Sequence, residues 1–205
     1  MSNKGILVVL SGFSGSGKGT LVKRLLEEYD NYALSISMTT RMPRPGEVHG
    51  KSYFFVTQEE FKSTIDRDGL LEYARYCDNF YGTPKKQVMD WMDEGINVIL
   101  EIDVQGALQI KKSYPEGIFI FILPPSIEEL KNRILGRGSE TEETMARRLG
   151  AALKEISSID EYDYRVVNED LQEAVDRVKA IISAEHSKIN DEEVERIINR
   201  YKEEL

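Results

Sequence analysis

The chain has 205 residues, of which 40% are hydrophobic and 31% are charged, and its formal net charge is −9. This composition is typical of a folded globular protein, and the excess of acidic residues disfavours a nucleic-acid partner, whose backbone is also negative. The longest strongly apolar run, residues 118–123, is far shorter than the roughly 20 residues of a membrane-spanning helix, and the N-terminus has no secretory-signal pattern, so we expect a cytoplasmic protein that does not bind membranes.

A glycine-rich stretch follows directly after the first predicted strand, residues 6–10. Its glycines allow successive backbone N–H groups to point at an anion, and the amphipathic helix predicted over residues 19–29 directs its positive end to the same place. This pattern favours a phosphate-binding loop over a turn without a ligand. The loop comprises Gly12, Phe13, Ser14, Gly15, Ser16, Gly17, Lys18, Gly19 and Thr20.

Gly19 occupies the position at which the usual phosphate-loop pattern has a Ser or Thr that binds Mg²⁺ directly. Thr20, one residue later, then serves a different phosphate, or the metal is held through water. Lys18 is in the expected place to reach the outer phosphates of a nucleotide. The sequence therefore predicts a nucleotide site but leaves the metal contact open.

Two arginines, Arg41 and Arg44, follow the second predicted strand, residues 33–37, in a polar segment that two prolines stiffen. A guanidinium group offers forked donors that match two phosphate oxygens, and it stays charged at any working pH. An Arg-x-x-Arg segment alone is more often a solvated basic loop. We treat the pair as a second candidate phosphate site because it accompanies the glycine-rich loop.

Residues 35–94 interrupt the alternation of strand and helix with short strand-like pieces at residues 52–56 and 70–76. A capping box that starts at Thr57 predicts a helix between these pieces. Thr83 and Pro84 predict a cap and a first-turn proline for a helix over residues 85–94. We expect this stretch to form an inserted lobe of mixed strands.

Asp103 and Glu101 lie at the end of the third buried strand, residues 97–102. Open α/β sheets bind their ligands at the carboxyl ends of the strands, so both carboxylates are candidates for a ligand or metal contact. Carboxylate oxygens suit Mg²⁺, directly or through its water shell. The sequence does not separate the roles of these two acids.

Two further strands, residues 118–123 and 164–167, complete an alternation typical of a parallel α/β sheet with helices on both faces. Between them, a Ser-x-x-Glu box at Ser126 opens a helical, arginine-rich stretch, residues 128–149, which we expect to act as a flap. The last segment, residues 190–205, predicts an amphipathic helix that packs on the core or on a second subunit. Its apolar face comprises Val194, Ile197, Ile198 and Tyr201.

Taken together, residues 12–20, 37–53, 80–83, 101–106 and 137–141 resemble the guanylate kinase family, and the resemblance extends over residues 6–184. It implies an α/β P-loop nucleoside monophosphate kinase with a parallel five-stranded core sheet and helices on both faces. The core would comprise residues 1–34, 95–127 and 150–205, the mixed α/β GMP-binding lobe residues 35–94, and the helical lid residues 128–149. The implied reaction transfers the γ-phosphoryl group of MgATP to GMP or dGMP, giving ADP and GDP in the case of GMP, in purine nucleotide metabolism and GMP recycling, with Mg²⁺ as the cofactor.

The resemblance also implies residue roles. The GMP site would comprise Ser37, Arg41, Arg44, Tyr53, Glu72, Tyr81, Thr83 and Asp103. The ATP site would comprise residues 12–20 together with Arg133, Arg137 and Asn168, and the groups acting in transfer would be Lys18, Arg41, Arg44, Asp103, Arg137 and Arg148. Glu72 would accept hydrogen bonds from guanine N1–H and the 2-amino group, which adenine cannot offer in the same way. Glu101 and Asp103 would hold Mg²⁺ through water.

Two alternatives accompany this interpretation. Some proteins with this fold are non-catalytic modules that bind phosphorylated protein segments, but here the residues of the ATP side are present. A kinase for another nucleoside monophosphate is the second alternative, and Glu72 and Ser37 distinguish it from a GMP kinase. The expected partners are the small molecules GMP and ATP, and the sequence is compatible with a monomer or a homo-oligomer.

Overall fold

The computed structural model describes residues 4–76, 78–135, 142–189 and 191–203. Its main sheet has five parallel strands in the order β2-β7-β1-β8-β9. These strands are β1 (Leu7–Gly12), β2 (Tyr32–Leu34), β7 (Asn97–Glu101), β8 (Ile118–Leu123) and β9 (Tyr164–Val167). The predicted α/β class with a five-stranded parallel core sheet is confirmed.

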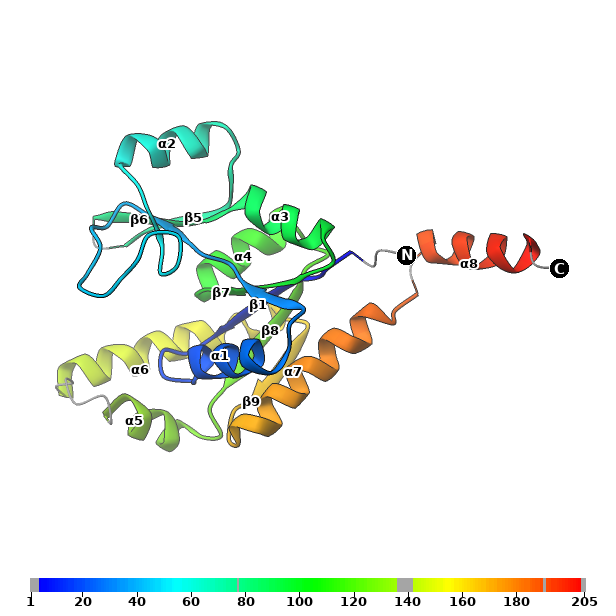
Figure 1. Cartoon of the computed structure of the whole chain (residues 1–205). Coiled ribbons are helices and arrows are strands. Elements are labelled where there is room, and N and C mark those ends of the chain that lie inside the picture. The colour runs from blue at the N-terminus through cyan, green and yellow to red at the C-terminus, as the bar shows by residue number, and fades with distance from the viewer. Residues whose placement is uncertain (1–3, 77, 136–141, 190, 204–205) are drawn as a thin grey trace.

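Helices cover both faces of this sheet (Figure 1). The central strands are continuous apolar runs because both of their faces are buried. Val8 and Leu10 of β1 pack on one face against α1 (Lys18–Glu28) and α7 (Leu171–His186). Leu7 and Val9 pack on the other face with buried residues of α3 (Lys85–Asp93) and α4 (Val104–Ser113). The strand order places the carboxyl ends of β1 and β7 side by side, where such sheets bind ligands.

A second, four-stranded sheet in the order β4-β3-β6-β5 forms the inserted region. It consists of β3 (Met38–Thr39), β4 (Phe54–Phe55), β5 (Leu70–Tyr76) and β6 (Asn79–Pro84), and it carries α2 (Gln58–Asp66). Phe61 of α2 is buried and stacks on Phe80 at 5.4 Å between ring centroids. The capping box predicted at Thr57 is present, with both reciprocal hydrogen bonds to Glu60 formed.

The prediction that Thr83 caps α3 is wrong. Thr83 is a strand residue of β6, and Pro84 is the N-cap, without a side-chain capping bond. A residue before proline prefers extended backbone, so the strand continues through Thr83, and its hydroxyl is free to bond elsewhere. Although α3 lies within residues 35–94, its buried Val88 and Met92 pack with the main sheet.

The arginine-rich stretch forms α5 (Ile127–Leu135) and α6 (Glu142–Ile156), beside the loop that follows β1 (Figure 1). At the start of α5, Ser126 Oγ accepts from the backbone N–H of Glu129 at 3.0 Å, as its box predicts. The Glu129 carboxylate, however, pairs with Arg133 at 2.8 Å. A one-turn 3₁₀ helix, η1 (Ile159–Glu161), leads from α6 to β9.

The last helix, α8 (Asp191–Glu203), extends away from the body of the molecule (Figure 1). Its apolar face stays exposed, so the predicted packing on the core of the same chain does not occur among the described residues. No helix in the described ranges is long and apolar enough to cross a membrane.

Candidate functional site

The loop after β1 forms an open cradle. Gly12, Gly15 and Gly17 have positive φ angles of 146°, 97° and 89°, which side chains with a Cβ rarely adopt. Gly17 is the N-cap of α1, so the positive end of this helix opens into the cradle. The hollow has a volume of about 280 Å³ and is lined by Ser14, Gly15, Gly17, Lys18, Gly19, Thr20 and Glu101. This geometry suits a chain of phosphate groups.

Lys18 lies folded over this loop. Its Nζ donates to the carbonyl oxygens of Gly12 and Phe13 at 2.5 and 3.1 Å. The ammonium group therefore lies at the rim of the hollow, which Lys18 also lines.

Glu101, at the end of β7, closes the hollow on the side of Gly19. A Cβ built on Gly19 would lie 3.4 Å from a Glu101 carboxylate oxygen, so the glycine leaves this carboxylate uncovered toward the hollow. The protein walls around Glu101 remove part of its hydration and raise its pKa, while the nearby charge of Lys18 opposes this shift. The carboxylate is thus placed to meet a cation that arrives with the phosphates.

Asp103 has a structural task that the sequence interpretation did not include. It is the N-cap of α4, and its Oδ1 accepts from the backbone N–H of Gly106 at 2.8 Å. Asp is a favoured N-cap residue and Asp103 directly precedes the helix, so this bond was open to prediction. Its other carboxylate oxygen remains available for a ligand.

Glu72 and Thr83 form a buried polar pair on the second sheet, with 8% and 1% of their surfaces exposed. Thr83 Oγ1 donates to Glu72 Oε1 at 2.7 Å. The register of β5 against β6 shifts between Leu70 and Tyr73, so Glu72 lies in the irregular part of the strand. Such an irregularity can change the direction in which a side chain points. Burial and then the charge of Asp103 raise the pKa of the Glu72 carboxyl, against the effect of the Thr83 hydrogen bond.

This pair borders the main sheet. A Cβ built on Gly106, in the first turn of α4, would lie 3.2 Å from Glu72 Oε2. Since Asp103 caps the same turn, the buried carboxylate of the second sheet and the carboxyl end of β7 lie together. The two sheets therefore meet at the predicted acceptor site.

Arg41 is held by Glu47, an acid that was not among the predicted site residues. Its guanidinium donates to both oxygens of Glu47 at 2.8 and 3.0 Å, which lowers the pKa of the Glu47 carboxyl. Glu47 also accepts from the backbone N–H of Arg44 at 2.7 Å. The signal in the sequence was an acid three residues after Arg44 and six after Arg41.

Aromatic rings surround this arginine. The Arg41 guanidinium lies 5.5 Å from the ring centre of Tyr53, and the rings of Tyr53 and Tyr81 lie 6.1 Å apart. The structure therefore brings Arg41, Tyr53 and Tyr81 together, whereas Arg44 is exposed beside them. Ser37 lies just before β3, where its carbonyl accepts from the Phe54 N–H at 2.9 Å.

Arg133 and Asn168 brace the back of the glycine-rich loop. Arg133 donates to the carbonyl oxygens of Asn168 and Ser16 at 3.0 and 3.4 Å, and the Asn168 amide donates to the same Ser16 carbonyl at 2.9 Å. Arg148 reaches the loop from α6 and donates to Ser14 Oγ at 3.3 Å. Arg137 lies outside the described residues.

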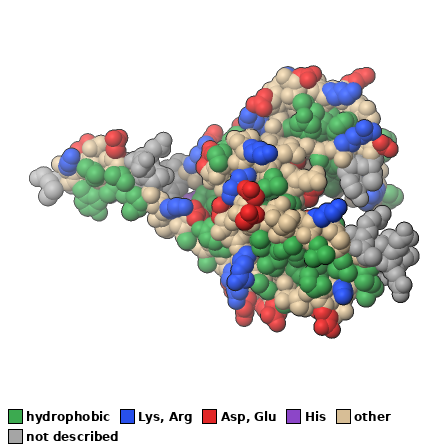
Figure 2. Space-filling view, turned by 180° about the vertical axis from the view of Figure 1, so that it is seen from behind, with side chains coloured by type: hydrophobic (Ala, Val, Ile, Leu, Met, Phe, Trp, Pro, Cys, Tyr) green, Lys and Arg blue, Asp and Glu red, His purple; other side chains and the backbone are tan. Residues whose placement is uncertain are grey.

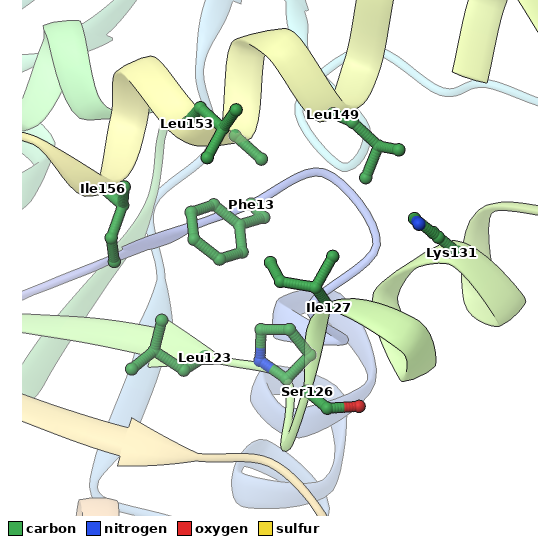
Figure 3. Close-up of a pocket in the computed structure, with 10 residues that line it drawn as sticks. Phe13, Leu123, Ser126, Ile127, Lys131, Leu149, Leu153 and Ile156 are labelled. Atoms are coloured by element: carbon green, nitrogen blue, oxygen red, sulfur yellow. The ribbon is translucent and has the colours of Figure 1, made fainter. Parts of the chain in front are cut away.

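An apolar pocket of about 430 Å³ lies beside the loop, between α5 and α6 (Figure 3). The ring of Phe13, the loop residue after Gly12, points into it, and Ile127, Leu149 and Leu153 face that ring. The sequence interpretation did not predict this pocket. The lining that the structure describes is apolar except for Ser126 and Lys131.

The fold and the cradle define a P-loop kinase with a second, inserted sheet. Two structures with low sequence identity share this fold: TT1252 from Thermus thermophilus, with 16% identity and a TM-score of 0.53, and shikimate kinase from Bacteroides thetaiotaomicron, with 13% and 0.50. They cover 89% and 87% of this chain, and 98% of each of their own. At this identity the likeness shows the fold alone.

The family model described as guanylate kinase matches residues 4–185, and the chain belongs to this family. Guanylate kinases from Clostridium acetobutylicum and Clostridioides difficile are 55% and 52% identical to it. These alignments cover 93% and 98% of this chain and 90% and 98% of the relatives. The crystal structure of guanylate kinase from Anaplasma phagocytophilum matches with a TM-score of 0.71 and 39% identity over 91% of this chain and 89% of its own.

Proposed function

We propose that this chain transfers the γ-phosphoryl group of MgATP to GMP, giving ADP and GDP, and that it accepts dGMP less well. The observation that carries the proposal is the buried Glu72–Thr83 pair of the second sheet, which lies beside the first turn of α4 and so near the carboxyl end of β7. The described partner of this carboxylate is the neutral Thr83 hydroxyl, and a buried carboxylate is costly unless further hydrogen bonds, here those of a ligand, complete its shell. Guanine offers two adjacent donors that do so.

Acceptor selection follows from this pair. Guanine presents N1–H and the 2-amino group to Glu72, whereas adenine presents an unprotonated N1 that would face the carboxylate. A site built to bond a polar group rejects an analogue without it by about 10⁴-fold, because its buried groups stay unpaired. Ser37 and Thr83 are the proposed contacts to the remaining polar edge of the base.

Arg41, Arg44, Tyr53 and Tyr81 are the proposed contacts to the GMP phosphate. The phosphate would take the place of Glu47 on the forked donors of Arg41, with the two tyrosine hydroxyls beside it. Fixing this phosphate orients its attacking oxygen in line with the γ-phosphate of ATP, and positioning of this kind supplies most of the catalysis in phosphoryl transfer. A single weak contact would not hold the attacking oxygen in line with the γ-phosphate.

The proposed ATP site is the cradle formed by the loop after β1. Its backbone N–H groups and Lys18 would bind the β- and γ-phosphates and stabilise the charge that builds up during transfer. Arg148 reaches the loop from α6, and the resemblance assigns Arg137 to the same task. The bond from Asn168 to Ser16 supports the loop, so we assign Asn168 and Arg133 to its shape as well as to the nucleotide.

The residues present fit Mg²⁺ held mainly by phosphates and water. Among the described residues no group of three or more His, Cys, Asp or Glu side chains is placed to hold a metal ion. Glu101 faces the hollow beside Gly19 and supplies a hard oxygen donor for the water shell, with Asp103 as the second candidate. The bound ion would neutralise phosphate charge during transfer.

We also propose a division of labour along the chain. Residues 35–94 would carry the GMP site, residues 128–149 the lid, and the remaining segments the core with the cradle. If the GMP lobe and the lid close over the two nucleotides, they would keep water from taking the γ-phosphoryl group. GMP and ATP are cytoplasmic metabolites, and we place the reaction there.

The test is a turnover assay of purified protein with MgATP and, in turn, GMP, dGMP, AMP, UMP and CMP. We expect turnover with GMP in the range of about 1 to 100 s⁻¹ that is typical of kinases, slower turnover with dGMP, and none above background with the other three. Turnover confined to AMP would assign the protein to another monophosphate kinase activity. Absence of turnover with every acceptor would favour a binding module.

A further inference from the structure

The acid proposed to recognise guanine lies on an edge strand. In the second sheet, β5 pairs with β6 on one side only, since the strand order is β4-β3-β6-β5. Their register shifts between Leu70 and Tyr73, so regular pairing does not set the direction of the Glu72 side chain. Figure 2 shows acidic and basic side chains scattered over one face of the molecule, whereas Glu72 exposes only 8% of its surface. The contacts that bury and orient this carboxylate therefore come in part from another element.

That element is α4, which contacts three consecutive residues of β5. Leu71 belongs to a buried cluster that also contains residues of α4. Glu72 has its Oε2 beside Gly106, in the first turn of the helix. The backbone N–H of Tyr73 donates to Gln109 Oε1 at 3.3 Å. Gly106 and Gln109 are three residues apart and lie on the same side of α4, and this side of the helix supports residues 71–73.

Gly106 is a helical glycine whose backbone does not require glycine. It lies inside α4 and does not have a positive φ angle. A glycine inside a helix lowers the stability of the helix relative to alanine. A Cβ at this position would lie 3.2 Å from Glu72 Oε2 and 3.4 Å from its Cδ, so the carboxylate would have to shift by a few tenths of an ångström. Thr83 bonds the other carboxylate oxygen at 2.7 Å and restricts such a shift.

We propose that Gly106 and Gln109 are positioning residues for guanine recognition: they hold Glu72 where its carboxylate meets N1–H and the 2-amino group of GMP together. The proposal rests on the proposed function and adds two residues that act through Glu72. The two guanine donors are adjacent and point the same way, so a carboxylate that is displaced or tilted keeps one bond and weakens the other. Discrimination between a base with both donors and a base with one therefore depends on these two residues.

The test compares GMP with inosine monophosphate (IMP), whose base keeps N1–H but lacks the 2-amino group. The measured quantity is the ratio of kcat/KM for GMP to kcat/KM for IMP at saturating MgATP. Wild-type protein is expected to prefer GMP by about 10- to 100-fold, because the 2-amino group adds a hydrogen bond to a charged group. Gly106→Ala is expected to lower this preference about 5-fold or more, with the KM for ATP unchanged, because the methyl group displaces the carboxylate.

Gly150→Ala is the matched control. Gly150 is an exposed helical glycine of α6, and open space lies where its Cβ would be. The substitution gives the same change in helix propensity as Gly106→Ala without a contact to Glu72. It is expected to leave the GMP preference within about twofold of wild type.

A second pair of variants tests the hydrogen bond from Tyr73. Gln109→Leu removes the acceptor of the Tyr73 N–H but keeps a good helix former of similar size, and it is expected to lower the GMP preference about 3-fold. Gln109→Glu keeps an acceptor oxygen and is expected to leave the preference within about twofold of wild type. Gln109 is exposed, so both variants are expected to fold, and circular dichroism checks this.

The outcomes separate this proposal from the proposed function. No turnover of GMP by wild-type protein would overturn both. Turnover of GMP without a preference over IMP would leave the proposed reaction in place and exclude positioning for the 2-amino group. A preference that Gly106→Ala and Gln109→Leu leave unchanged, or equal losses of kcat/KM for the two acceptors, would overturn the positioning role alone, because a merely structural role affects both acceptors alike. If Gly106→Ala does not fold, Gln109→Leu and Gln109→Glu decide between these results.

Discussion

Replacing Glu72 by Gln isolates the charge that we assign to guanine recognition. The variant keeps the side-chain volume and the oxygen that accepts from Thr83 Oγ1 at 2.7 Å. It replaces the other oxygen with an amide donor, which would oppose a donor of guanine. A hydrogen bond to a charged group contributes about 1.5–3 kcal/mol, so losing one such bond and weakening the other costs about 3 kcal/mol. This cost corresponds to a rise of about 10²-fold in the KM for GMP, with the KM for ATP unchanged.

The same substitution is expected to stabilise the fold, although it weakens GMP binding. Burial and the charge of Asp103 raise the pKa of Glu72 in the folded protein, so the folded state binds this proton more tightly than the unfolded state. Its stabilising contribution is fully present below the unfolded pKa of about 4.3 and is lost as the pH rises through the raised pKa. Glu72→Gln has no such loss. We therefore expect its Tm to exceed that of wild type by an amount that grows from pH 4.5 toward pH 8.

Initial-rate kinetics at varied GMP and ATP, and calorimetric Tm values across this pH range, measure both effects. Glu94→Gln removes one carboxylate at an exposed position, and we expect it to change neither KM. Equal rises in the KM values for GMP and ATP would show that Glu72 has a general structural role. A Tm difference that does not change with pH would refute the assigned electrostatic cause.

Five other perturbations test the remaining parts of the site. Lys18→Ala is expected to lower turnover by about 10³-fold or more while circular dichroism shows an intact fold, because its charge acts on the transferring phosphate; residual turnover near wild type would remove this role. Arg41→Lys is expected to raise the KM for GMP at least about 10-fold in steady-state kinetics, since a point charge does not replace forked donors; an unchanged KM would contradict it. Gly17→Ala places a Cβ 2.4 Å from the Asn168 amide nitrogen at a φ of 89°, and urea unfolding is expected to show a loss of about 1–3 kcal/mol. A variant as stable as wild type would show that the loop relaxes freely. Chelation by EDTA is expected to stop turnover, and Glu101→Gln to raise the half-saturating Mg²⁺ concentration several-fold at fixed ATP; an unchanged Mg²⁺ requirement would remove Glu101 from the water shell.

Elements with a local cause were predictable from the sequence. β5, β8 and β9 have the predicted bounds. β8 is a continuous apolar run, and β5 and β9 are short segments rich in aromatic, leucine or valine residues. The capping box at Thr57 formed because its two bonds join residues only three apart. The second predicted strand, residues 33–37, is shorter and forms as Tyr32–Leu34, since pairing with β7 ends there.

Features that depend on long-range packing were not predictable in this way. The local pattern assigned Thr83 to a helix cap, whereas tertiary structure directs its hydroxyl to Glu72, eleven residues away in the chain. The brace from Asn168 to Ser16 joins positions 152 residues apart, and no local pattern encodes it. Without the family resemblance, Glu72 itself would have been assigned to an exposed strand position, because its burial depends on the approach of α4.

The charged groups of the site already have protein partners, and this explains how the fold tolerates them. Arg41 bonds Glu47, Glu72 bonds Thr83, and Lys18 bonds backbone carbonyl oxygens. A buried or half-buried charge without a partner costs several kcal/mol, so a site whose groups waited unpaired would weaken the protein. In the proposed reaction, substrate binding would be an exchange of partners: a phosphate would displace Glu47 or a carbonyl oxygen, and guanine would add donors to the acid that Thr83 already bonds. Each charged group therefore adds less to the net affinity for substrate than its contact with the substrate alone would suggest. The guanidinium and ammonium groups are, however, held close to the positions in which they would bind phosphate. This preorganisation lowers the cost of aligning the two phosphates.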